Sequence, residues 1–270
     1  MRAGDARVCS GAMCTRYVIP EQEAAEQEFA PQRAWWKFSR SFNVAPPRRV
    51  PAVRWHDGES EAVMLRWGLI PSWAEGDPAK ADAAQVDSSQ IQTSNLLSGA
   101  WLNSQRCILP LSGYYAWKMT PADYRQPYYV QVLARPMFGV AAVWDRSVAD
   151  DDDVIEGCAL LTVPPNGMLA EMLGGTMRMP AILRREDYET WLHGTPGQAR
   201  DLLATLPGEQ TLIHPVSPRI NSLRNDDEQL LQPVGQSLPQ PRGAAHAARI
   251  AVLRTQDRRV DTVRESVLSQ

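Results

Sequence analysis

The sequence has few of the residues that bind metal ions or form disulfide frameworks. Its 270 residues include only four cysteines and four histidines. The cysteines form no Cys-x-x-Cys pair and the histidines are scattered, a pattern that fits neither a zinc site nor a disulfide-stapled fold. We therefore expect a reduced, cytoplasmic protein that needs no metal and no cofactor.

Long apolar runs are also missing. No segment approaches the roughly 20 apolar residues that a membrane-spanning helix requires. The first twelve residues, MRAGDARVCSGA, contain no apolar stretch of the kind found in secretory signals. The sequence thus predicts a protein that neither enters nor crosses a membrane.

An excess of basic residues is the third absence. Lysine and arginine total 28 against 31 aspartates and glutamates, which gives a formal net charge of −3. Proteins that bind nucleic acid over a broad surface usually carry a basic domain that neutralises phosphates. Any contact with DNA is therefore expected to be local.

The residues that are present predict a core of mixed secondary structure. Apolar residues make up 44% of the chain, enough for one large domain. Segments 21–40 and 184–206 have helical spacing, and the acidic run at 150–153 is expected to form an exposed hairpin turn. Short β-branched or aromatic runs predict strands at Ala52–Trp55, Ala62–Trp67, Cys107–Leu111, Tyr128–Leu133, Phe138–Trp144 and Leu160–Val163. The mixture indicates an α+β architecture.

Several short motifs follow one another in a fixed order. They are MCTRY (13–17), FNVAP (42–46), LRWGLIPSW (65–73), RCILPLSGYYAWK (106–118), RMPAIL (178–183) and HPVSPRINSLRNDD (214–227). Together they resemble the SRAP family, the SOS response-associated peptidases understood as abasic-site processing proteins. The resemblance implies a mixed, barrel-like β-sheet flanked by helices. It also implies a DNA partner that contains abasic sites, either single-stranded or at a junction.

The resemblance divides the chain into three parts. Residues 1–12 are predicted to be a flexible arm, or to precede a natural start at Met13. Residues 13–234 are expected to form the SRAP domain. Residues 235–270 lose the core pattern and gain arginine, which predicts a disordered tail.

Cys14 matches the family residue that becomes N-terminal once the initiator methionine is removed. A terminal cysteine can react with the aldehyde of an open abasic site because its α-amine, with a pKa of about 7.7–8.0, is partly neutral near pH 7. The amine forms an imine, and the thiol then closes a thiazolidine ring. An internal cysteine has no free amine, so the chemistry requires translation from Met13 or a cleavage that exposes Cys14. The alternative is that Cys14 is merely a small buried residue.

Several polar positions of the family are altered. Counting back from Arg106 places Gln85 where the family has an asparagine for the opened sugar, and Asp87 where it has an arginine for phosphate. Ala116 replaces the expected glutamate, and Thr176 replaces the expected histidine. General acid or base help is typically worth about 10²–10⁴-fold in rate, and a threonine cannot shuttle protons at neutral pH. These changes predict an impaired catalytic site.

Other family positions are retained, and five of them are candidates for DNA binding: Arg16, Asn43, Trp67, Trp73 and Arg178. The tryptophans can stack on unstacked bases or belong to the core. The arginines can contact phosphates or form internal ion pairs. The sequence leaves these alternatives open.

Three hypotheses for function follow from the resemblance. The leading one is an abasic-site processing protein of the DNA damage response, which binds single-stranded DNA and crosslinks to it through Cys14. The second is a non-enzymatic single-stranded-DNA-binding or regulatory paralogue with the same fold. The third is a thiol autopeptidase that removes its own N-terminal extension. The expected location is the cytoplasm, at the nucleoid when DNA is bound, and a monomer is favoured.

Overall fold

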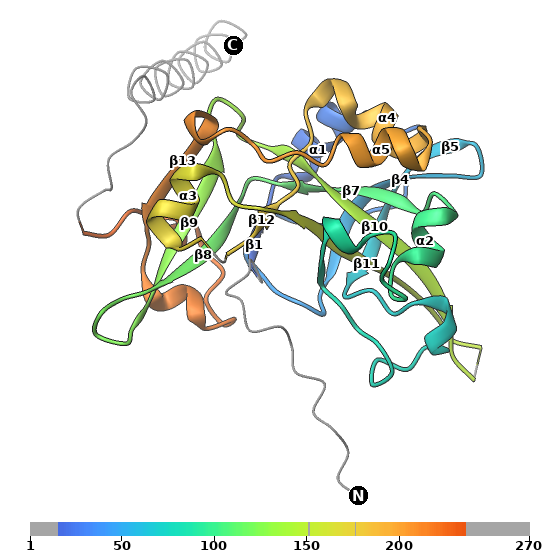
Figure 1. Cartoon of the computed structure of the whole chain (residues 1–270), viewed down its shortest axis with the longest axis horizontal. Coiled ribbons are helices and arrows are strands. Elements are labelled where there is room, and N and C mark those ends of the chain that lie inside the picture. Colours follow the sequence, from blue (N-terminus) through green and yellow to red (C-terminus); the bar gives the residue numbers. More distant parts are fainter. Residues whose placement is uncertain (1–15, 151, 176, 236–270) are drawn as a thin grey trace, which may run out of the picture.

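The computed structural model describes residues 16–150, 152–175 and 177–235. Its strands form two sheets, and short helices lie around them (Figure 1). The five-stranded sheet has the order β13-β9-β8-β1-β3, with β13 at Thr211–Pro215, β9 at Arg125–Val132, β8 at Gly113–Met119, β1 at Tyr17–Ile19 and β3 at Ser41–Val44. All of its neighbouring strands are antiparallel.

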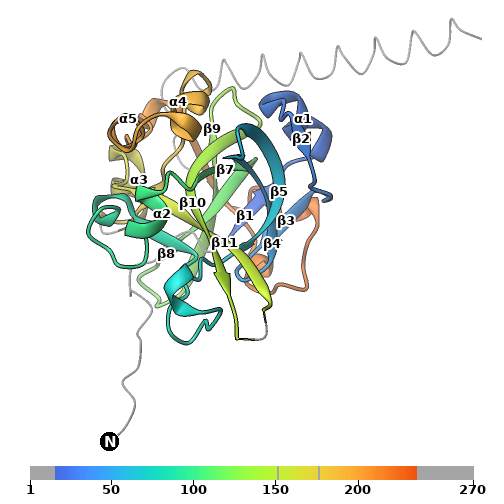
Figure 2. The same ribbon diagram turned by 90° about the vertical axis from the view of Figure 1, so that its right-hand side faces the viewer.

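The larger sheet closes into a five-stranded barrel. Its ring consists of β4 (Arg49–His56), β5 (Glu59–Trp67), β11 (Val154–Val163), β10 (Phe138–Val148) and β7 (Arg106–Leu111). The closing contact is a parallel pairing in which Gly157 and Cys158 of β11 face Arg66 and Trp67 of β5. Figure 2 shows these strands curving around one another. The predicted α+β fold with a mixed, barrel-like sheet is therefore confirmed.

Three short strands extend the barrel sheet. They are β2 (Arg33–Ala34) beside β5, and β6 (Gln85–Asp87) and β12 (Met179–Pro180), which both pair with β11. β6 runs parallel to β11 and β12 runs antiparallel to it. This arrangement brings segments that are far apart in the sequence to one part of β11.

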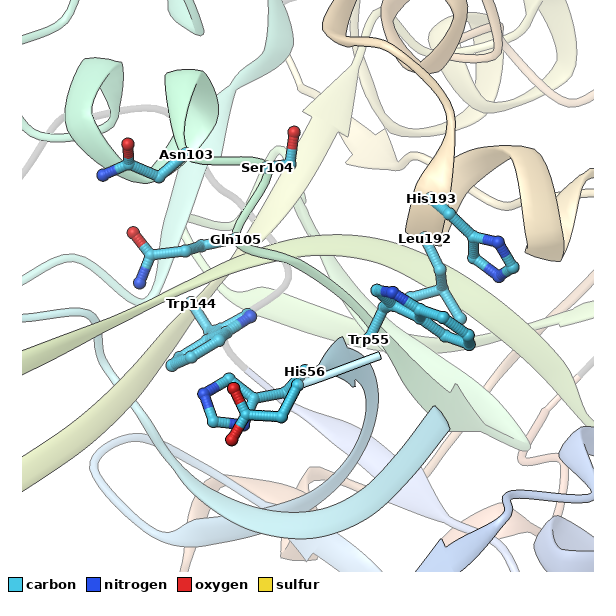
Figure 3. A pocket seen from close by; sticks show the side chains of 9 residues that line it. Trp55, His56, Asn103, Ser104, Gln105, Trp144, Leu192 and His193 are labelled. Atoms are coloured by element: carbon cyan, nitrogen blue, oxygen red, sulfur yellow. The ribbon is translucent and has the colours of Figure 1, made fainter. Parts of the chain in front are cut away.

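Alternating side chains fill the barrel interior, as the two-residue period of a strand requires. Arg54 on β4 bonds Glu156 on β11 at 2.9 Å and lies 4.1 Å from the ring of Trp144 on β10, and these contacts cross the barrel. At this end of the barrel, Trp144 and His56 line a cavity (Figure 3).

The chain leaves the barrel for the other sheet at Ser112. The predicted strand Cys107–Leu111 is confirmed as β7 in the barrel, and the rest of the 106–118 motif forms β8 in the five-stranded sheet. Glycine is required at position 113, because a Cβ atom there would collide with the ring of Tyr129. The change of sheet at this corner aims the inward side chains of β8, including Ala116, at the common core.

The helices are shorter than the sequence predicts. The predicted helix 21–40 is α1 (Gln22–Phe29), because Ala30 adopts the left-handed conformation at φ 40° and Pro31 follows. The predicted helix 184–206 is two helices, α4 (Tyr188–His193) and α5 (Pro196–Asp201), separated at Gly194. The other described α-helices are α2 (Ser98–Leu102) and α3 (Gly167–Leu173).

Predictions for the chain ends and the acidic run have different outcomes. Residues 150, 152 and 153 are exposed between the antiparallel strands β10 and β11, so the predicted hairpin turn is confirmed. The predicted arm 1–12 and residues 236–270 of the predicted tail lie outside the described residues. Within the described part of the chain, every helix is too short or too polar to cross a bilayer.

Candidate functional site

The candidate site begins where the described chain enters β1. The backbone carbonyl of Arg16 accepts a hydrogen bond of 3.0 Å from the amide of Tyr115 on β8. The Arg16 guanidinium donates to the carbonyl of Ile220 at 2.7 Å and to Oδ1 of Asn43 at 2.9 Å. Burial lowers the pKa of this guanidinium from its ordinary value, but an arginine stays charged at neutral pH. Arg16 is thus used to fasten the chain internally.

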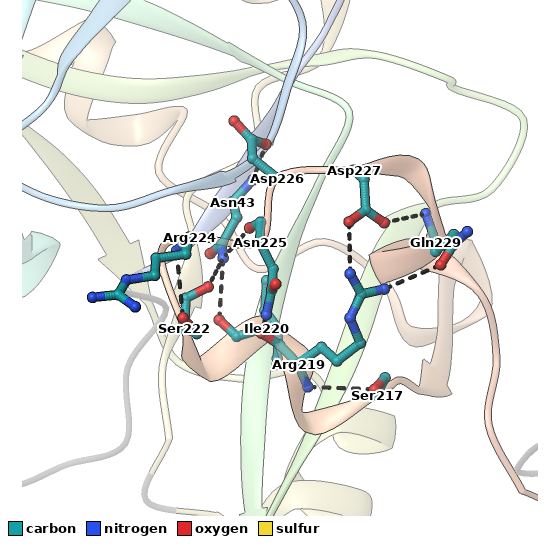
Figure 4. A network of polar contacts seen from close by, with 10 residues as sticks. All are labelled: Asn43, Ser217, Arg219, Ile220, Ser222, Arg224, Asn225, Asp226, Asp227 and Gln229. Carbon is teal, nitrogen blue, oxygen red and sulfur yellow. Dashed lines mark hydrogen bonds and ion pairs between the residues drawn. The ribbon is translucent and has the colours of Figure 1, made fainter.

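Asn43 on β3 holds the segment 218–227 against the sheet (Figure 4). Its side chain is 3% exposed, and its Nδ2 donates to the carbonyls of Ile220 at 3.2 Å, Ser222 at 3.0 Å and Asn225 at 2.8 Å. Burial of an amide without such partners would destabilise the folded state, because the group would lose its hydrogen bonds to water. Asn43 therefore has a positioning role, and its amide is not available to DNA.

Asp226 completes this attachment, and sequence reasoning did not single it out. Its carboxylate accepts from Ser41 Oγ at 2.8 Å and from the amide of Asn43 at 3.1 Å. The signal that marks it is the acidic pair at the end of the HPVSPRINSLRNDD motif, directly after the loop that Asn43 binds. Carboxylates that accept backbone N–H groups form strong, charge-assisted hydrogen bonds.

Ala116 lies on the inward face of β8. It is 1% exposed and faces Tyr128 of β9 in the antiparallel ladder. Burial raises the pKa of the Tyr128 phenol, so this hydroxyl remains protonated and can donate a hydrogen bond at neutral pH. On the opposite face of β8, Trp117 donates through its indole nitrogen to Asn221 at 3.0 Å. The position expected to supply a carboxyl group thus carries a methyl group inside the core.

Asp87 and Arg178 form an ion pair across β11. Arg178 donates to an oxygen of Asp87 at 2.6 Å, and also to Oγ1 and the carbonyl of Thr162 at 3.0 and 2.8 Å. The pair exists because Thr162 of β11 faces Asp87 of β6 and Pro180 of β12. The carboxylate at the position where the family has an arginine is therefore paired with an internal cation, and the internal-pair alternative holds for Arg178.

Gln85 lies two residues before Asp87, opposite Leu160 of β11. Its Oε1 atom is buried and has no hydrogen-bond partner among the described residues. A buried acceptor that lacks a donor is costly, so this oxygen is suited to accept from a bound group. The predicted site residues Cys14 and Thr176 lie outside the described residues.

The two candidate tryptophans have different environments. Trp67 is fully buried, and its indole donates to the carbonyl of Ala84 at 2.7 Å. A base cannot reach it, so the stacking prediction is wrong and the core alternative holds. Trp73, in the 3-10 turn Ser72–Ala74, is 52% exposed and donates to the carbonyl of Asn95 at 3.0 Å. Its ring is fixed and open to a ligand.

Two further arginines, Arg219 and Arg224, are on the 218–227 segment. Arg219 pairs with Asp227 at 2.8 Å and bonds Gln229 at 3.1 Å. Figure 4 shows the Arg224 guanidinium pointing away from this network, and it has no bond to another described residue. Among the described residues, no group of three or more His, Cys, Asp or Glu side chains is arranged to hold a metal ion.

A comparison with models of known families identifies the family of this chain. The model of the SOS response associated peptidase (SRAP) family matches residues 13–223. The chain belongs to this family.

Curated relatives are named for abasic site processing. The chain is 24% identical to abasic site processing protein YoqW of Bacillus subtilis over 230 residues, covering 82% of this chain and 99% of that protein. It is 27% identical to abasic site processing protein HMCES of Gallus gallus over 237 residues, which is 75% of this chain and 69% of that protein.

Solved structures share the fold. A protein from Bacteroides thetaiotaomicron has a TM-score of 0.65 at 24% identity, with 72% of this chain and 85% of that one covered. A protein from Bordetella bronchiseptica also has a TM-score of 0.65, at 23% identity, with 76% of this chain and 100% of that one covered. At these identities the likeness concerns the fold alone.

Proposed function

We propose that the protein processes abasic sites in single-stranded or junction DNA and crosslinks to them through Cys14 once this residue is N-terminal. The observation that carries the proposal is the anchoring of Arg16, two residues after Cys14. Four hydrogen bonds hold Arg16 to β8, to Asn43 of β3 and to the 218–227 segment. Such anchoring is what a reactive chain terminus requires, because a mobile nucleophile is poorly oriented toward its substrate.

The reaction balances with the groups of one residue. The neutral α-amine of Cys14 adds to the aldehyde of the opened sugar, and loss of water gives an imine. The thiol then adds across the C=N bond, its proton moves to the nitrogen, and a thiazolidine results. The name that the relatives carry supports this substrate.

The altered positions determine how the cycle ends. Ring opening and release of the adduct both need proton transfers, and Ala116 has no titratable group to supply them. General acid or base help is worth about 10²–10⁴-fold. We therefore expect the protein to form its covalent DNA adduct slowly and to release that adduct more slowly still.

The deciding experiment is a denaturing-gel crosslinking assay with single-stranded DNA that carries one abasic site. Full-length protein, a version beginning at Cys14, and the same version with Cys14→Ser are compared. A heat-stable shifted band only from the version that begins with cysteine is expected. Serine keeps the amine but lacks the thiol, so an equally stable band from Cys14→Ser would overturn the thiazolidine chemistry.

A second function, non-enzymatic binding of single-stranded DNA, is favoured by one observation. Trp73 and Arg224 are exposed and could serve as a stacking platform and a phosphate contact, while Ala116 removes the expected acid. This function predicts salt-sensitive binding that Cys14→Ala leaves unchanged. Absence of a band from every version in the gel assay, with binding retained, would select it.

Autopeptidase activity is the remaining route to a terminal Cys14. It requires that residues 1–13 be removed from a longer translation product. Intact-mass measurement of protein recovered from its native cell decides this point. A mass that includes Met1 would exclude the autopeptidase.

A further inference from the structure

A cavity of about 410 Å³ lies at the end of the barrel formed by the β4–β5 turn. The residues that line it come from β4 and its turn, from the segment 103–105, from β10 and from the end of α4 (Figure 3). They include none of the residues of the candidate site described above. The cavity therefore has no part in the proposed crosslinking chemistry.

Aromatic rings form two walls of this cavity. The Trp55 indole, on the outer face of β4, stacks on the His193 ring with a centroid distance of 4.2 Å and an interplanar angle of 24°. The Trp144 indole, on the inner face of β10, meets the His56 ring edge to face at 5.7 Å. Figure 3 shows the two indoles on opposite sides of the open space. Such walls suit a flat ring.

Trp144 adds an unused hydrogen-bond donor. Its side chain is 4% exposed, and its indole nitrogen has no partner among the described residues. In Figure 3 this nitrogen points toward the middle of the cavity. The Arg54 guanidinium lies 4.1 Å from the ring centroid and fixes the ring. A fixed, buried N–H without an acceptor costs free energy that a ligand acceptor would recover.

The charge of the cavity excludes a strongly anionic ligand. Among the residues that the structure describes, Asp57 is the one carboxylate that lines it, and no lysine or arginine does. A broader groove adjoins it through His56 and Asp57. That groove has as many carboxylates as cations, and Arg54 is occupied by Glu61 and Glu156. A phosphate would gain little here, whereas a neutral ring with both donors and acceptors would be matched by the Asn103 and Gln105 amides.

We propose that this barrel-end cavity binds a nucleobase, packed against the Trp55 indole with a ring or carbonyl acceptor bonded to the Trp144 indole. The carboxylate of Asp57 accepts from an exocyclic amine or a sugar hydroxyl. The base can belong to a free nucleoside or to an unstacked position in a single strand. The proposal rests on cavity geometry and stands independently of crosslinking by Cys14.

The test is a titration of full-length, ¹⁵N-labelled protein, observed through the indole N–H cross-peaks of its nine tryptophans. The probes are adenosine, guanosine, cytidine and thymidine, and a short oligothymidylate. The cross-peaks of Trp55 and Trp144 are expected to shift saturably with at least one nucleoside, while that of Trp73 does not. Shifts that the oligothymidylate reproduces would assign the base to a strand, and shifts with nucleosides alone would assign a free nucleoside.

Two variants make the outcome decisive. Trp144→Phe keeps a flat ring but removes the donor, and should weaken binding about fivefold, the factor for one hydrogen bond. Trp55→Ala, at the half-buried rim, should weaken it about tenfold or more, and it remains informative if Trp144→Phe fails to fold. Absence of shifts at Trp55 and Trp144 with every probe, or unchanged affinity in Trp55→Ala, would overturn the proposal. Neither result affects the crosslinking assay, which Trp55→Ala should leave unchanged.

Discussion

Replacing Asn43 with alanine tests whether the 218–227 segment and the chain entry are held by one side chain. The Asn43 Nδ2 contacts three backbone carbonyls, but it has only two hydrogens, so two hydrogen bonds are lost on its donor side. Its Oδ1 also loses the bond from the charged Arg16. Each neutral bond is worth about 1 kcal/mol and a bond to a charged group about 1.5–3 kcal/mol. Because water can reach part of the exposed loop and replace some of these bonds, we expect the free energy of unfolding to fall by about 2–4 kcal/mol.

The measurement is urea unfolding followed by tryptophan fluorescence, with Asn225→Ala as the matched control. Asn225 also donates to a backbone carbonyl, that of Arg219 at 2.7 Å, but in an exposed position. Removal of this bond should cost less than about 1 kcal/mol. Equal losses of unfolding free energy in the two variants, or a loss below about 1 kcal/mol for Asn43→Ala, would refute the role of Asn43 in holding the 218–227 segment.

The same substitution has a functional consequence. Arg16 would keep its bonds to the segment 218–227 but lose the partner on β3. In protein that begins at Cys14, Asn43→Ala should slow crosslinking at a temperature where the variant is still folded. An unchanged rate would mean that this contact does not position the terminus.

Three further predictions follow from the described core. Gly113→Ala should cost about 1–3 kcal/mol by overpacking, whereas Gly167→Ala, where a Cβ meets nothing within 4 Å, should be nearly neutral in the same urea titration. Burial raises the pKa of the Cys158 thiol to about 12 and also raises that of Cys107, so iodoacetamide at pH 8 should modify both only after unfolding. The two protonated thiols contribute to the stability of the folded state in full below the ordinary thiol pKa of about 8.5. This contribution is lost as the pH rises toward 12. Labelling of either thiol in folded protein would contradict this. Ala116→Glu should speed release of the Cys14 adduct by about 10²-fold or more while lowering stability, and an unchanged release rate in a gel time course would argue against the missing acid as its cause.

The strands were predictable where their side chains have a uniform environment. The predicted runs Ala52–Trp55, Ala62–Trp67 and Phe138–Trp144 lie inside β4, β5 and β10, whose residues are buried in or around the barrel. The closure of the barrel was not predictable from periodicity, because it depends on a parallel pairing between β5 and β11. The predicted helix 184–206 was too long because the apolar spacing continues through Gly194, whereas the helical backbone ends at His193.

The site was predictable as a set of motifs but not as a set of contacts. The family motifs located Arg16 and Asn43, whose side chains contact each other at 2.9 Å. Whether Trp67 faces the core or a ligand depends on which face of β5 is inside the barrel, and the sequence does not contain that information. The Asp87–Arg178 pair likewise needs β6 and β12 to flank the same strand.

The corner at Ser112 has a consequence for cooperativity. The five-stranded sheet takes its strands from residues 17–19, 41–44, 113–119, 125–132 and 211–215, and the barrel takes its strands from the intervals between them. No single cut in the chain separates one intact sheet from the other. Truncation from either end therefore removes strands from one sheet and strips the shared core of the other. Fragments should not fold alone, and the chain should unfold in one all-or-none transition.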